Sequence, residues 1–157
     1  MFLIQRKRKF VYHTTIKIMT AQRTDTIIIN EDEHVMYGLP LDQYWKQNDN
    51  KPSLFSMTTS LNRGYYAKWL IENSKLFLID FYGECLFPPP MKEYSLIDIF
   101  PSAEDKVFAE WFTGDITIPM GKQVNYFHGG WGATYEYNTT IKVCNGVVID
   151  PGSFMTE

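Results

Sequence analysis

The chain has few of the residues on which redox chemistry and metal binding depend. Its 157 residues include two cysteines, Cys85 and Cys144, and three histidines. The cysteines form no C-x-x-C motif, and no histidine stands at metal-ligand spacing from another histidine or from a cysteine. We therefore expect no metal site, no disulfide framework and no cofactor.

Long hydrophobic runs are also missing. No apolar stretch approaches the roughly 18 residues that a membrane span requires. Residues 1–13 lack the apolar centre and the small-residue cleavage site of a signal peptide. These absences predict a cytoplasmic protein with no membrane partner.

Sequence motifs of enzyme active sites occur in this chain only in part. Residues 128–132 (HGGWG) are similar to the glycine-rich oxyanion loop of esterases, but the chain has no G-x-S-x-G segment to supply a nucleophile. Six residues separate Gly114 from Gly121, where a phosphate-binding P-loop has four between its glycines. We therefore expect a protein that is not an enzyme.

Charge of the two signs is unevenly distributed. Residues 1–18 carry five basic residues and no acid, which leaves 10 basic and 18 acidic residues, a net charge of −8, for the rest of the chain. Because Met19 opens a natural-looking start, we expect residues 1–18 to be a non-native or disordered basic extension. Residues 19–157 then form a single globular domain. Such an acidic domain argues against binding to nucleic acid and is compatible with a basic protein partner.

Aromatic and β-branched residues alternate along much of the chain. Residues 65–72 and 75–82 flank the polar pair Asn73-Ser74 and predict a β-hairpin at the centre of the fold. Asn145-Gly146 predicts a second hairpin with a type I′ turn. An acidic loop at residues 31–33 is expected to join two further strands, 26–30 and 34–39.

Other segments are less regular. We expect a helical turn or two at residues 41–45, a strand at 54–60, and a strand or helical turn at 94–100. Residues 106–121 read as two strands joined by a turn at Thr113-Gly114, and Ser102 could cap a short helix. Together these patterns predict a β-rich domain of seven to nine strands, mainly antiparallel hairpins, with one or two short helices. The sheet is either a single-layer, barrel-like one or part of an α+β fold.

Three segments carry a resemblance to a known family. They are residues 69–78 (WLIENSKLFL), residues 107–122 (VFAEWFTGDITIPMGK), and Tyr135-Glu136 with residues 145–148 (NGVV). Together they resemble a widespread family of small bacterial proteins whose function is not established, over residues 24–150. Leu70 and Glu110 stand where that family usually has isoleucine and aspartate. The resemblance implies one compact bacterial domain, and no activity or cofactor.

Two hypotheses of function follow. The first is a non-enzymatic protein-binding domain, one version being an immunity-type inhibitor whose acidic surface meets a basic toxin. The second is an enzyme or a small-ligand binder, with its site at the loop that runs from Gly129 to Gly132. The candidate ligand-binding or partner-binding residues are Arg63, Glu72, Asp80, Glu110, His128 and Trp131.

Overall fold

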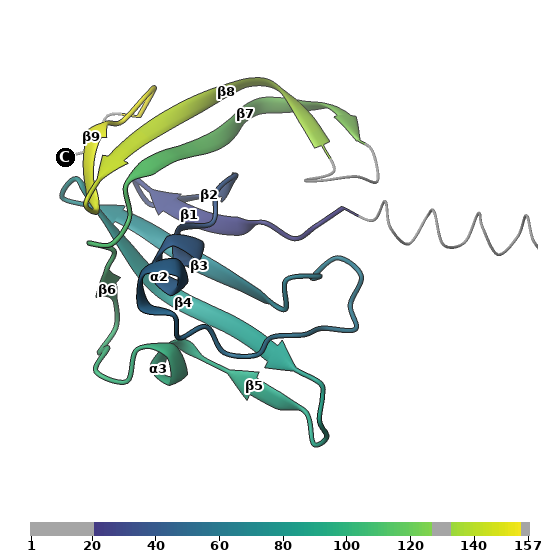
Figure 1. Ribbon diagram of the computed structural model, residues 1–157. Helices are drawn as coiled ribbons and strands as arrows, with labels where there is room; N and C mark the ends of the chain where they lie inside the picture. The colour runs from purple at the N-terminus through teal and green to yellow at the C-terminus, as the bar shows by residue number, and fades with distance from the viewer. Residues whose placement is uncertain (1–20, 127–132, 155–157) are drawn as a thin grey trace, which may run out of the picture.

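Nine strands form one curled sheet in the residues that the computed structural model describes, 21–126 and 133–154 (Figure 1). The strands are β1 (Asp25–Ile29), β2 (Asp32–Met36), β3 (Tyr65–Glu72), β4 (Lys75–Cys85), β5 (Lys92–Tyr94), β6 (Val107–Phe108), β7 (Gly114–Tyr126), β8 (Ala133–Cys144) and β9 (Val147–Asp150). Two helices accompany them, α2 (Pro40–Asn48) and α3 (Leu96–Ile99). In Figure 1 the β7–β8 ribbon arches over β1, β3 and β4, so that the sheet wraps around a core. Neither of these helices is long and apolar enough to cross a membrane.

The strand order turns the sheet into a nearly closed barrel. Around the sheet the order is β2-β1-β3-β4-β9-β8-β7, and β5 and β6 both pair with β4. β1 runs parallel to β3, whereas the other strand pairs are antiparallel. At the seam, Tyr37 N–H donates to the Thr117 carbonyl at 2.7 Å, and Thr117 N–H donates back at 3.1 Å. The predicted β-rich, mainly antiparallel, barrel-like domain with short helices is confirmed.

Large side chains fill the middle of the barrel. On β3 every second residue from Tyr65 to Ile71 is buried, as the alternation predicts. Helix α2 turns Leu41 and Trp45 inward, and the Trp45 ring meets the Tyr65 ring edge-on at 5.0 Å. Each such burial stabilises the fold by roughly 1.5–3 kcal/mol. The interior of the barrel is therefore filled by the protein's own side chains.

Helix α2 begins where the sequence predicts a helical turn. Pro40 occupies the first turn, where its missing N–H is not needed. Gln43 then clamps the helix to the segment between β6 and β7. Its Nε2 donates to the Thr113 carbonyl at 2.8 Å, and its Oε1 accepts the Thr113 N–H at 3.1 Å. Trp111 adds a hydrogen bond from Nε1 to the Pro40 carbonyl at 2.9 Å.

Three hairpins turn through pairs of residues with positive φ. The pairs are Asn30-Glu31, Asn73-Ser74 and Asn145-Gly146, with φ between 48° and 80°. Both central residues of a type I′ turn need this conformation, so the predicted turns at the second and third pairs are confirmed. The first turn corrects a prediction: it lies at Asn30-Glu31, and Asp32 already belongs to β2.

Three further expectations are wrong. Residues 54–60 form no strand, since only Phe55 bridges to β4. Residues 106–121 are not a hairpin, because β6 pairs with β4 whereas β7 pairs with β8. No helix follows Ser102. The capping box forms instead at Ser95 and Asp98 around α3, and the helix stops before Pro101 because the residue preceding a proline avoids the helical conformation.

Candidate functional site

A buried carboxylate lies at the start of β1. Asp25 shares the inward face with Ile27 and Ile29, and it is 0% exposed. It accepts hydrogen bonds from Arg63 Nη2 at 2.5 Å, from the Ala67 N–H at 3.0 Å and from Trp69 Nε1 at 3.0 Å. Burial raises the pKa of Asp25, and these three donors oppose that rise.

The network around Asp25 continues to helix α2. The hydroxyl of Tyr65 donates to Asp42 Oδ1 at 3.1 Å, and burial together with the Asp25 and Asp42 charges raises the Tyr65 pKa. Trp45 Nε1 is buried and has no hydrogen-bond partner in the described part of the chain. Because the Asp25 carboxylate is sealed from solvent, no substrate can reach it. The network therefore joins β1, β3 and α2 and is structural.

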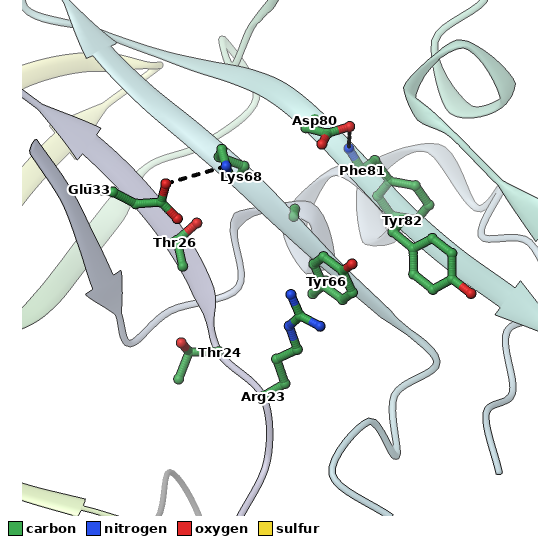
Figure 2. Close-up of a pocket in the computed structure, with 10 residues that line it drawn as sticks. Arg23, Thr24, Thr26, Glu33, Tyr66, Lys68, Asp80, Phe81 and Tyr82 are labelled. Carbon is green, nitrogen blue, oxygen red and sulfur yellow. Dashed lines mark hydrogen bonds and ion pairs between the residues drawn. The ribbon is translucent and has the colours of Figure 1, made fainter. Parts of the chain in front are cut away.

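The outer face of β1, β3 and β4 carries a hollow of about 220 Å³, drawn in Figure 2. A charged row crosses it. Lys68 Nζ lies 3.3 Å from Glu33 Oε1, and Lys68 stands directly opposite Asp80 in the β3–β4 ladder. Asp80 accepts the N–H of its neighbour Phe81 and forms no ion pair with a described residue. Lys68 therefore pairs with Glu33 and also lies across the ladder from Asp80.

An aromatic row runs beside the charged one. The Arg23 guanidinium lies 3.5 Å above the Tyr66 ring centroid, and the Tyr66 and Tyr82 rings are 5.3 Å apart (Figure 2). The Tyr82 hydroxyl donates to Glu84 Oε2 at 2.7 Å, and this hydrogen bond raises the pKa of Tyr82 to about 12.

The aromatic row ends at a pair of like charges. Glu84 stands directly opposite Glu93 across the β4–β5 pair. We call Asp80, Tyr82, Glu84 and Glu93 the Tyr82 strip. It presents three carboxylates and one aromatic ring to solvent on the outside of the barrel.

A second hollow, of about 650 Å³, opens at the end of the barrel beside α2. Its walls are the rings of Tyr44, Phe108 and Trp111, with Glu110 and Lys75 at the rim. The Tyr44 and Trp111 rings meet edge-on at 4.9 Å. The hollow is broad and open, and the charges of Glu110 and Lys75 are of opposite sign.

The structure places the predicted site residues in separate surroundings. Arg63 is bound to Asp25, Asp80 lies on the outer face, and Glu110 borders the second hollow. Glu72 ends β3 and pairs with Lys106 at 2.6 Å. The remaining two, His128 and Trp131, lie outside the described residues, as does the loop from Gly129 to Gly132.

Sequence reasoning missed two residues that matter here. Asp25 is in phase with Ile27 and Ile29, and that period of two placed it on the buried face. Tyr82 stands between Asp80 and Glu84 on one face of β4, a pattern of alternating acidic and aromatic residues that could have marked the strip. The residues that the structure describes hold no cluster of His, Cys, Asp and Glu suited to a metal ion.

Comparison with protein-family models, with curated proteins and with solved structures finds no match to this chain. Its function must therefore be argued from the surface described above.

Proposed function

We propose that this protein is a non-enzymatic protein-binding domain whose acidic surface meets a basic protein. The Tyr82 strip is the observation that carries the proposal. Its three carboxylates form no ion pair with a described residue, although they lie on one face of the sheet and two of them, Glu84 and Glu93, stand directly opposite each other. Charges left uncompensated in this way favour a partner of opposite sign.

The rest of the molecule supports binding at the outside. Trp69 and Tyr65, both 0% exposed, occupy the barrel interior. The buried Asp25 carboxylate is surrounded by its own three donors. The chain beyond residue 18 carries 18 acidic and 10 basic residues, so its field attracts basic proteins over a distance and raises their association rate.

A basic toxic enzyme is one partner that fits, and this protein would then act as its immunity-type inhibitor. We place the pair in the bacterial cytoplasm, because the family resemblance is bacterial and both cysteines, Cys85 and Cys144, are free thiols.

The proposal is tested with the full chain. Tagged protein is cross-linked in its native host, the captured proteins are identified, and each basic candidate is purified and its binding reconstituted. We expect one basic protein to bind with an association rate that falls steeply between low and high salt. A rate that does not respond to salt, or the recovery of acidic partners alone, would count against the proposal.

A further inference from the structure

The Tyr82 strip combines one aromatic residue with three acidic residues on the same face of the sheet. Asp80 and Glu84 lie two residues before and after Tyr82 on β4, so all three side chains project from the same face. Glu93 faces Glu84 from β5. Tyr82 therefore has an acidic residue two positions away in each direction along the strand, and its hydroxyl contacts the one at Glu84.

The strip contains a like-charge pair that forms no ion pair with any described residue. Like charges directly opposite one another in a β-ladder are destabilising, and Glu84 and Glu93 are such a pair. Lys92 is the residue next to Glu93, but its ammonium lies over the Tyr94 ring at 4.8 Å. A cation supplied from outside would remove this repulsion.

The neighbouring ring shows which cation suits the surface. Arg23 places its guanidinium over the Tyr66 ring, with 3.5 Å between the guanidinium carbon and the ring centroid. Tyr82 is the next ring in the same row, 5.3 Å from Tyr66 (Figure 2). Tyr82 therefore offers a second ring in this row, and the carboxylate of Glu84 is hydrogen-bonded to its hydroxyl.

We propose that the Tyr82 strip binds an arginine side chain of a basic protein partner. The guanidinium stacks on the Tyr82 ring and donates hydrogen bonds to the carboxylates of Glu84 and Glu93, which face each other across the β4–β5 ladder. Arginine suits the strip better than lysine, because a planar guanidinium stacks on a ring and donates to carboxylates as a fork, whereas an ammonium is a compact point charge. This inference rests on the proposed function and specifies where, and through which side chain, the partner binds.

The test uses the full chain and the peptide acetyl-Gly-Arg-Gly-amide, followed by amide NMR shifts. Matched peptides carry lysine or citrulline in place of arginine; citrulline keeps the planar shape and removes the charge. We expect the arginine peptide to shift the amides of residues 80–84 and 92–94. It should bind about two- to fivefold more tightly than the citrulline peptide, the range expected of one exposed cation–π contact, and also more tightly than the lysine peptide. Citrulline should bind more weakly than either.

Substitutions test where the arginine peptide binds, and one of them should strengthen its binding. Glu93→Gln and Tyr82→Leu should each weaken arginine binding at least twofold, whereas Glu104→Gln, an exposed acid elsewhere, should leave it unchanged. Arg23→Gln frees the Tyr66 ring and should strengthen arginine binding more than lysine binding. A gain of this kind cannot come from misfolding.

Four results would overturn the inference. They are the absence of any response to the arginine peptide, equal binding of arginine and lysine, equal loss in Glu104→Gln and Glu93→Gln, and a response that emerges only after Arg6 and Arg8 are replaced by glutamine. The last would assign the strip to the chain's own basic segment. Because the peptide test needs no protein partner, the strip can fail while a basic protein still binds elsewhere. Conversely, arginine binding without a recoverable partner would reject the proposed function alone.

Discussion

The guanidinium of Arg63 reaches the carboxylate of Asp25 and ties the segment before β3 to the first residue of β1. The Asp25 side chain is 0% exposed and that of Arg63 is 16% exposed. Removing the cation would leave a sealed carboxylate with only the Ala67 and Trp69 donors. Loss of Arg63 would therefore be costly chiefly because it would leave the buried Asp25 carboxylate without its cation.

We predict that Arg63→Met lowers the free energy of unfolding by about 3–5 kcal/mol, the usual cost of stranding one member of a buried ion pair. Urea unfolding measures the loss. Lys142→Met is the matched control, since Lys142 pairs with Asp115 at 3.5 Å where both side chains are more than half exposed. Its change should stay within about 1 kcal/mol. Similar losses in the two variants would show that Asp25 does not depend on Arg63.

Ser74 offers a stabilising substitution. It holds φ of 58° in the β3–β4 turn, a conformation that costs an L-residue energy and costs glycine almost none. Ser74→Gly should therefore raise the free energy of unfolding by roughly 0.5–1 kcal/mol. Gly146→Ala is the opposite control, because a Cβ there would lie 2.6 Å from the Ala109 carbonyl oxygen. Chemical denaturation should move the two midpoints in opposite directions, and a lower midpoint for Ser74→Gly would contradict the prediction.

The Glu84–Glu93 pair predicts a variant that is more stable and binds less. Glu93→Lys replaces repulsion by attraction across the β4–β5 ladder and should raise Tm by about 1–2 °C. It should also abolish the response to the arginine peptide. Glu104→Lys makes the same charge change in an exposed loop and should alter neither. An unchanged Tm for Glu93→Lys would mean that the two carboxylates do not repel each other measurably.

The alkaline titration of Tyr82 reports its contact with Glu84. The hydrogen bond holds the phenol neutral and raises its pKa to about 12. Since the folded-state pKa lies above the ordinary value of 10.0, the stabilisation is complete below pH 10 and is lost as the pH rises through 12.

Replacing Glu84 should return the Tyr82 pKa toward its ordinary value. We expect Glu84→Gln to lower it, measured as the absorbance difference at alkaline pH between each protein and its Tyr82→Phe counterpart. An identical titration in the two backgrounds would remove Glu84 as the cause of the shift.

Local pattern was enough to predict two of the hairpins, β3–β4 and β8–β9. Residues 65–72 were expected as a strand and form one, and the turn at Asn145-Gly146 follows from two residues that tolerate positive φ. Ser74 and Glu31 adopt the same conformation without glycine. The flanking strands impose it on them, which explains why the first turn was placed one residue too late.

The pairing of strands that are distant in the sequence could not be predicted from the alternation of residues. The parallel contact between β1 and β3 is made by residues about forty positions apart, Ile27 and Trp69, and alternation carries no information about partner or direction. The same holds for the candidate site. Acids can be counted in a sequence, but only the register shows that Glu84 faces Glu93 and that Glu72 is paired with Lys106. Asp80 lies on the outer face and remains a candidate binding residue, whereas the Arg63 side chain is paired with Asp25.

The bridge between Tyr37 and Thr117 gives the barrel a place to open. The ladders on either side of it, β1–β2 and β7–β8, are held by several residue pairs, whereas this seam is a single bridge between segments remote in sequence. Its closure brings distant segments together through one residue pair, so it should be among the last contacts to form during folding and among the first to break in the native state. The amides of these two residues should exchange with solvent deuterium ahead of those in the centre of β3. The barrel could therefore open at this bridge while its buried side chains stay packed.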